Sequence, residues 1–145
     1  MDAGLEVAID WWDDDVVILR VRASNGRFAG TTKLYAGHQS WLAFAEVLRD
    51  FPVDSSDARE YQLGTFDPSY AGGGISVKFF CTDGVGHTAV AIRIYGTAVG
   101  SDQRAETANF AITIEASAVD SFVQQLRGME LRRGASAFLS GVKSN

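Results

Sequence analysis

The chain has 145 residues, of which 46% are hydrophobic and 21% charged, so it is long enough for one sizeable core and too apolar to be disordered. Its net charge of −5 disfavours direct binding of nucleic acid and favours basic partners. The single cysteine excludes an internal disulfide, and no apolar run is long enough to cross a membrane. Because the N-terminus lacks a secretory pattern, we expect a cytoplasmic protein.

The first part of the chain predicts three strands. Apolar and polar residues alternate over 5–10, 16–23 and about 27–35, and this period of two is typical of strands with one buried face. Residues 11–15 are Trp-Trp-Asp-Asp-Asp and predict a turn, because neighbouring carboxylates repel one another and are well solvated. Asn25-Gly26 predicts a type I′ hairpin turn, which needs positive φ at both central residues.

The period then changes to that of a helix. One apolar stripe contains Trp41, Phe44, Ala45, Leu48 and Phe51. Ser40 is expected to cap this helix and Pro52 to end it. A polar loop and a short strand at 60–64 are predicted to follow.

The clearest pattern in the chain is a pair of strands between Ile75 and Tyr95. The alternation is interrupted only by the turn 82–87, whose Asp83, Gly84 and Gly86 tolerate positive φ. A further hairpin turn is expected near Gly100-Ser101-Asp102, followed by a strand at about 106–115. A second helix is predicted from Ser117 to Gly128, with a stripe of Val119, Phe122, Val123 and Leu126.

These elements predict an α+β domain over residues 1–128. Because most connections have hairpin length, we expect a largely antiparallel sheet of about six to seven strands with two helices packed on one face. That face is expected to bury Phe44, Leu48, Phe122 and Leu126 against Val17, Leu19, Val77, Phe79, Ile92 and Ile112. The opposite face would carry Arg20, Arg22, Lys33, Lys78 and Arg93 with Glu60 and Gln62. Residues 129–145 have weak periodicity and are expected to form a C-terminal extension, for which fraying and partial disorder both stay open.

The acidic turn has three possible roles. Asp13, Asp14 and Asp15 could bind a divalent cation, but neighbours in sequence cannot all face one ion and the spacing is not that of a calcium loop. They could only keep the turn solvated. They could also form a partner-binding patch anchored by Trp11 or Trp12, since buried aromatic side chains carry much of the binding energy at interfaces. Four carboxylates of the first helix and its following loop are expected to extend that patch: Glu46, Asp50, Asp54 and Asp57.

Catalytic candidates in the sequence are weak. His87 beside Asp83 could act as a general base, although capping of the hairpin is the commoner role. Cys81 is expected to face the core while His87 lies at the turn, which argues against a nucleophile pair. The glycines at 72–74 lack the lysine and the helix of a phosphate-binding loop. We therefore expect no enzyme activity, no metal and no cofactor.

The order of the motifs over about residues 15–127 resembles that of the WapI-family immunity-like proteins. The residues that carry the resemblance are Trp41, Leu42 and Phe44; Glu60, Tyr61 and Leu63; Asp83, Gly84, Gly86 and His87; Phe110, Ile112 and Ile114; and Phe122 with Leu126. Members of this family look like small cytoplasmic bacterial proteins, and some neutralise a cognate polymorphic toxin. The resemblance therefore implies a binding protein for a basic toxin domain. The alternative is a small-ligand-binding domain or an enzyme with a pocket between sheet and helices.

Overall fold

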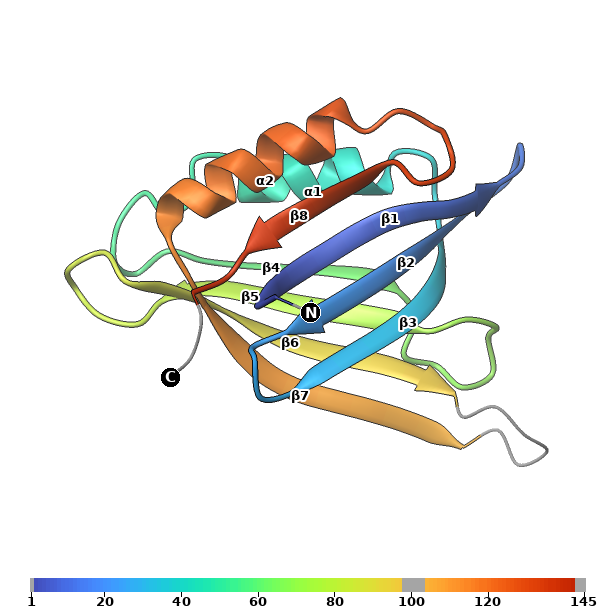
Figure 1. Cartoon of the computed structure of the whole chain (residues 1–145), viewed down its shortest axis with the longest axis horizontal. Coiled ribbons are helices and arrows are strands. Elements are labelled where there is room, and N and C mark those ends of the chain that lie inside the picture. The colour runs from blue at the N-terminus through green and yellow to red at the C-terminus, as the bar shows by residue number, and fades with distance from the viewer. Residues whose placement is uncertain (1, 98–103, 143–145) are drawn as a thin grey trace.

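The computed structural model describes residues 2–97 and 104–142, which form two antiparallel sheets and two helices (Figure 1). Sheet A has the strand order β3-β2-β1-β8, and sheet B has the order β4-β5-β6-β7. Sheet A consists of β1 (Gly4–Trp12), β2 (Val17–Ser24), β3 (Ala29–Ala36) and β8 (Ser136–Ser140). Sheet B consists of β4 (Ala58–Gly64), β5 (Gly74–Cys81), β6 (Thr88–Thr97) and β7 (Ala105–Ile114). The helices are α1 (Ser40–Leu48) and α2 (Ala116–Gly128).

The α+β class and the antiparallel pairing are confirmed, but the described strands form two sheets of four instead of one sheet of six to seven. The break falls at α1, because β4 pairs with β5 and not with β3. Alternation along a strand shows which side chains share a face, but it does not show which strands are neighbours. The hairpin turn predicted near Gly100 lies outside the described residues.

The segment after Met129 differs most from what its sequence pattern predicted, because part of it forms the strand β8. Residues Gly4 to Ala8 pair with Ser140 to Ser136, so the first and last described strands are neighbours. Ala137 and Leu139 are fully buried. Only these two residues of a five-residue strand face the core, so the alternation is too short to stand out in the sequence.

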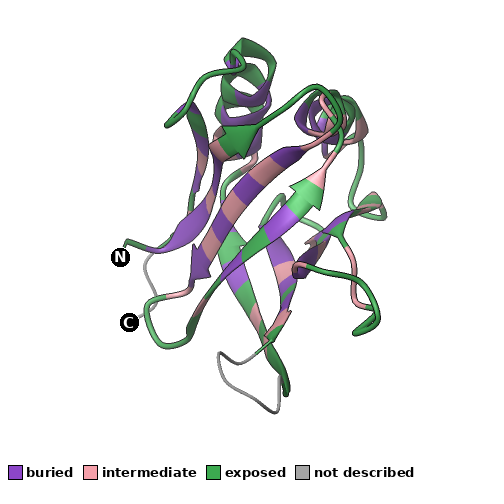
Figure 2. Cartoon of the chain, turned by 90° about the vertical axis from the view of Figure 1, so that its right-hand side faces the viewer, coloured by how far each residue is buried: buried purple, intermediate pink, exposed green. Residues whose placement is uncertain are grey.

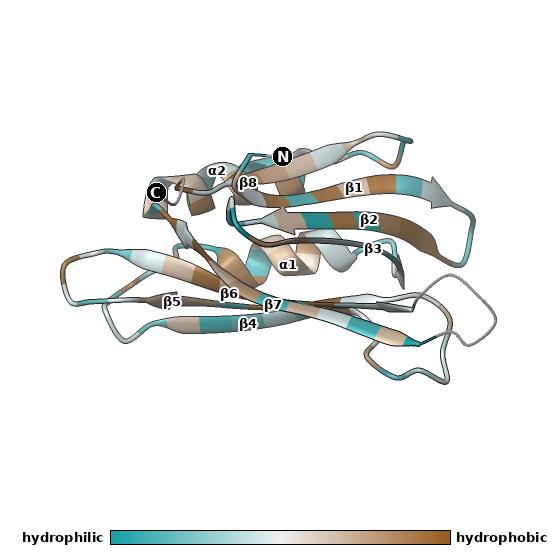
Figure 3. Cartoon of the chain, turned by 60° about the horizontal axis from the view of Figure 1, so that its bottom comes forward, coloured by the Kyte–Doolittle hydropathy of each residue, from teal (hydrophilic) through white to brown (hydrophobic). Residues whose placement is uncertain are grey.

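The core lies between the inner faces of the two sheets, and the helices close one side of it (Figure 3). α1 contacts β4 and α2, and α2 contacts β8, so the helices connect one edge of sheet B with one edge of sheet A. All ten residues predicted to form the core are at most 2% exposed: Val17, Leu19, Phe44, Leu48, Val77, Phe79, Ile92, Ile112, Phe122 and Leu126. Both helix stripes are therefore confirmed as core.

Phe44 of α1 shows how the helices join the sheets. Its ring stacks on Tyr61 of β4 with centroids 4.9 Å apart, and it meets Phe122 of α2 edge to face at 5.6 Å. The Tyr61 hydroxyl in turn donates a hydrogen bond to the Ser40 carbonyl (2.9 Å). One aromatic side chain thus connects both helices to sheet B.

The basic residues predicted to share one outer face lie on two. Arg20, Arg22 and Lys33 belong to sheet A, while Lys78 and Arg93 belong to sheet B. On sheet A the cations are paired, because Glu6 contacts Arg22 at 3.2 Å and Asp10 contacts Lys33 at 2.9 Å. Figure 2 shows the alternation of buried and less buried residues that separates inner from outer faces. No described helix is long and apolar enough to cross a membrane.

Details of the element ends also differ from the sequence pattern. The β2–β3 hairpin turn is centred on Gly26-Arg27, because the Asn25 N–H donates to the Phe28 carbonyl (3.0 Å) and Gly26 alone of the turn residues 25–28 has positive φ. The type I′ prediction is therefore wrong. Ser40 is the first residue of α1 and Gln39 is its cap, while Glu115 precedes α2.

Candidate functional site

The acidic turn closes the β1–β2 hairpin, whose tip extends beyond the neighbouring strands (Figure 1). The Asp13 carboxylate accepts hydrogen bonds from the backbone N–H groups of Asp15 (2.8 Å) and Val16 (2.9 Å). These two hydrogen bonds stabilise its charged form and lower the pKa of Asp13. Asp14 and Asp15 are exposed and form no ion pair with another described residue. Asp13 therefore builds the turn, while Asp14 and Asp15 present free carboxylates.

A β-bulge at Asp10 turns Trp11 onto the outer face of sheet A. The register passes from Ile9 opposite Leu19 to Trp11 opposite Ile18, so one residue of β1 has no partner in β2. Since Ile9 and Leu19 are buried, regular alternation would have pointed Trp11 inward. The sequence pattern contains no signal for this bulge, so it could not show that Trp11 lies on the outer face.

The bulge completes a row of apolar side chains across three strands. Trp11, Ile18 and Tyr35 lie opposite one another in β1, β2 and β3. Trp11 is 42% exposed, and Tyr35 is 46% exposed. Ile18 and Tyr35 are functional candidates that sequence reasoning missed, because only the strand register brings them beside Trp11. Trp12 lies opposite Val17 and is 36% exposed at the end of β1.

The other predicted carboxylates lie at the opposite end of α1. His38, just before α1, contacts the Asp13 carbonyl through Nε2 (2.7 Å), so the hairpin tip lies near the helix N-terminus. Glu46 is in the last turn of α1, and Asp50 follows it. The Asp54 carbonyl accepts a hydrogen bond from the Cys81 thiol at the end of β5 (3.6 Å). A helix of nine residues is roughly 13 Å long, so the structure does not combine these carboxylates with the hairpin tip.

Three of these distant carboxylates already have cationic partners. Glu46 contacts Arg49 at 3.4 Å and Arg127 at 3.6 Å. Asp50 lies 4.0 Å from Arg49. Asp57 contacts Arg59 at 2.8 Å, and this charged hydrogen bond lowers the pKa of Asp57. Of the four, only Asp54 has no ion pair; its carboxylate accepts hydrogen bonds from Ser56.

The residues considered for catalysis form hydrogen bonds in and next to the β5–β6 turn. His87 Nδ1 contacts the Asp83 carboxylate within the β5–β6 turn, where both side chains are exposed. The same carboxylate accepts the backbone N–H of Val85 (2.9 Å), and these hydrogen bonds, that of His87 first, lower the pKa of Asp83. The Cys81 thiol bonds the Asp54 carbonyl. Within residues 2–97 and 104–142, no three His, Cys, Asp or Glu side chains gather in a metal-binding arrangement.

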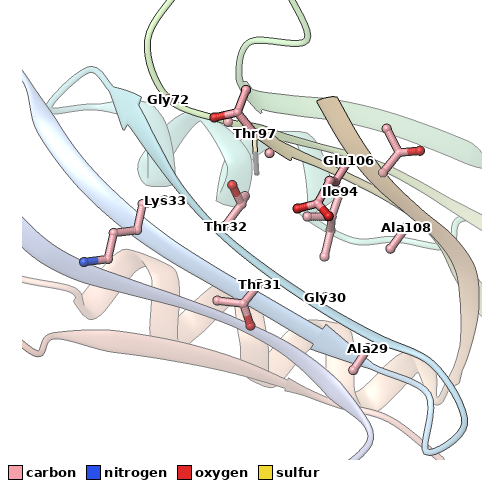
Figure 4. Close-up of a pocket in the computed structure, with 13 residues that line it drawn as sticks. Ala29, Gly30, Thr31, Thr32, Lys33, Gly72, Ile94, Thr97, Glu106 and Ala108 are labelled. Carbon is pink, nitrogen blue, oxygen red and sulfur yellow. The ribbon is translucent and has the colours of Figure 1, made fainter. Parts of the chain in front are cut away.

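Two of the spaces among the described residues bear on the ligand-binding alternative. The void between the sheets and α1 is lined by apolar side chains such as Leu5, Phe44 and Val77, and it has no room for a water molecule. A larger cleft of about 620 Å³ lies between β3 and the adjoining ends of β6 and β7 (Figure 4). Its lining is rich in small residues, among them Gly30, Gly73, Gly96 and Ala108.

Comparison of the chain with family models, with curated proteins and with solved structures found no match.

Proposed function

We propose that this chain is a binding protein that contacts its partner through the hairpin surface, defined as Trp11, Asp14, Asp15, Ile18 and Tyr35. The observation that carries the proposal is a cross-strand row in which Trp11 and Tyr35 are exposed on either side of Ile18, together with two carboxylates of the adjoining turn that form no ion pair with a described residue. Aromatic side chains supply large contact areas at interfaces, and unpaired carboxylates attract a basic partner over long range. The hairpin surface combines both properties, with the apolar side chains on β1, β2 and β3 and the carboxylates in the β1–β2 turn.

The partner we propose is a basic toxin domain, as the resemblance to immunity-like proteins implies. Nuclease toxins need cationic groups to hold phosphate, and the carboxylates of an inhibitor can occupy those groups. The net charge of −5 acts in the same direction. The proposal therefore describes a cytoplasmic inhibitor that binds protein and makes no direct contact with nucleic acid.

The test measures the rate at which this chain associates with any toxin domain found encoded beside its gene. Replacing Asp14→Lys together with Asp15→Lys should slow association at low salt, and the loss should shrink at high salt because exposed charges are screened beyond roughly 8 Å. Asp13 is left intact because its carboxylate holds the turn. The melting temperature should stay nearly unchanged.

The matched control is Asp2→Lys with Asp120→Lys, which makes the same change in net charge at two exposed positions away from the hairpin. It should slow association much less than the hairpin variant. A separate variant, Trp11→Ala, should speed dissociation, because it removes contact area and not charge. Equal effects of the two charge variants would refute the site, and absence of binding to any neighbouring toxin would refute the proposed function.

A further inference from the structure

The free edge of β3 faces the cleft of Figure 4. β3 pairs with β2 on one side only, and the Lys33 carbonyl accepts the Gly73 N–H on the other side (2.9 Å). Because the β2–β3 register is unbroken, Thr31 and Ala29 present their backbone N–H and C=O groups to the same side as Lys33. No described residue forms a hydrogen bond with these groups of Thr31 or Ala29. Sheet A therefore ends in a short row of unused backbone donors and acceptors.

Sheet B extends beneath this edge and forms a floor for the cleft. A Cβ atom on Gly30 would lie 3.1 Å from Ile94 Cδ1 and 3.4 Å from Ala108 Cβ, so β3 crosses directly over β6 and β7 there. The two floor strands continue past the crossing, and the side chains they show to the cleft are small at Gly96 and Ala108. The space beside the free edge of β3 is thus bounded by β6 and β7 on the side of sheet B and open to solvent on the other side, which leaves room for an added strand.

The cleft also carries one unpaired charge. Glu106 alternates with Ala108 along β7, so it lies on the cleft side of its strand, facing β3 in Figure 4. It forms no ion pair with a described residue. Lys33 also lines the cleft, but its ammonium group lies 2.9 Å from the Asp10 carboxylate. The net character of the cleft is therefore acidic, and it favours a basic group in the occupant.

We infer that this cleft binds an extended peptide segment of a partner protein, which adds to β3 as a fifth strand of sheet A and places a Lys or Arg side chain beside Glu106. An extended backbone carries N–H and C=O groups at the spacing that Thr31 and Ala29 present. Its inward side chains would rest on the small residues of β6 and β7. This inference is independent of the hairpin surface and of the identity of its partner.

The experiment is a selection of random decapeptides, displayed on phage, against the intact chain. Binding peptides should be enriched in Lys and Arg, and amide hydrogen exchange should show protection of Thr31 and Ala29 in the complex. Thr31→Pro removes one free N–H and no bond to β2, so an edge strand tolerates it, and it should weaken binding by about tenfold. Thr31→Val keeps the N–H and should change affinity by less than about twofold. Glu106→Gln should weaken the basic peptides, with a loss that shrinks at high salt.

A second measurement keeps the test valid if Thr31→Pro fails to fold. N-methylation of the peptide at alternate residues removes its own donors without altering the protein. Methylation at the positions that face β3 should abolish binding, while methylation at the intervening positions should not. Failure to enrich any peptide would overturn the inference, as would equal affinity for the two Thr31 variants or protection at another edge. A dimer of this chain that Thr31→Pro dissociates would also overturn it, because the occupant would then be a second copy.

Discussion

Gln125 of α2 holds both backbone groups of Phe138 in β8. The Phe138 N–H donates to Gln125 Oε1 (2.9 Å), and Gln125 Nε2 donates to the Phe138 carbonyl (3.2 Å). One side chain thus satisfies the outer edge of a strand that pairs with β1 on its other side. The Gln125 side chain thus provides the hydrogen bonds that a neighbouring strand would otherwise form with this edge of β8.

Replacing Gln125→Ala should therefore destabilise the fold by about 1–2 kcal/mol, because two hydrogen bonds to a strand edge are lost. Chemical denaturation would measure the change, and hydrogen exchange should rise at Phe138. The adjacent Gln124→Ala is the control, because Gln124 is exposed on the same helix and makes no such contact. Equal effects of the two substitutions would show that Gln125 does not hold β8.

Leu48→Ala should cost about 2–5 kcal/mol, the usual range for removing a large buried side chain. Leu48 is fully buried at the end of α1, between the helices and the sheets. Leu42→Ala makes the same chemical change on the same helix, where the side chain is 37% exposed, and should cost less than about 1 kcal/mol. The free energies of unfolding in denaturant would compare the two. A small loss for Leu48→Ala would contradict the position of α1 in the core.

Gly73 lies in the β4–β5 loop at a point where the loop backbone packs closely against β3 and β6. A Cβ atom there would overlap Thr32 Oγ1 and the Tyr95 carbonyl, one of which is backbone and cannot move away easily. Gly73→Ala should therefore lower stability by about 1–3 kcal/mol. At Gly37 a Cβ atom would meet nothing within 4 Å, so Gly37→Ala should stay within about 0.5 kcal/mol of the wild type. Thermal unfolding of both variants is the measurement.

The Asp57–Arg59 pair should make stability depend on pH in the acid range. The pKa of Asp57 is lowered in the folded state, so the pair contributes fully to the free energy of unfolding at pH values above the ordinary pKa of an aspartate. That contribution is lost as the pH falls through the pKa that Asp57 has in the folded protein. Asp57→Asn should reduce stability at neutral pH by about 1 kcal/mol, because it removes a charged hydrogen-bond acceptor. It should also flatten the acid decline of the unfolding free energy.

Urea unfolding at a series of acid pH values would measure that slope. Asp14→Asn, at the exposed hairpin tip, controls for the loss of one carboxylate. The prediction would be contradicted if both variants showed the slope of the wild type.

The sequence predicted what depends on local periodicity and missed what depends on distant contacts. The stripe containing Phe44 and Leu48 could be predicted, because one turn of helix determines which side chains share a face. The division into two sheets could not be predicted, because it depends on the pairing of β4 with β5 and not with β3. The same limit applies to the candidate site. Glu46 forms an ion pair with Arg127, which is far away in the chain. The sequence contains no indication of this pair, so from the sequence alone Glu46 is expected to be available to a partner.

The pairing of β1 with β8 has a consequence for synthesis of the protein. β1 is translated before the other strands of this domain, but one of its two neighbours in sheet A is formed by residues 136–140. Sheet A therefore stays incomplete while almost all of the domain is being translated, and an unpaired edge of β1 is exposed during that time. Truncations that end at α2 should leave that edge open to aggregation, although they keep every residue of both helices.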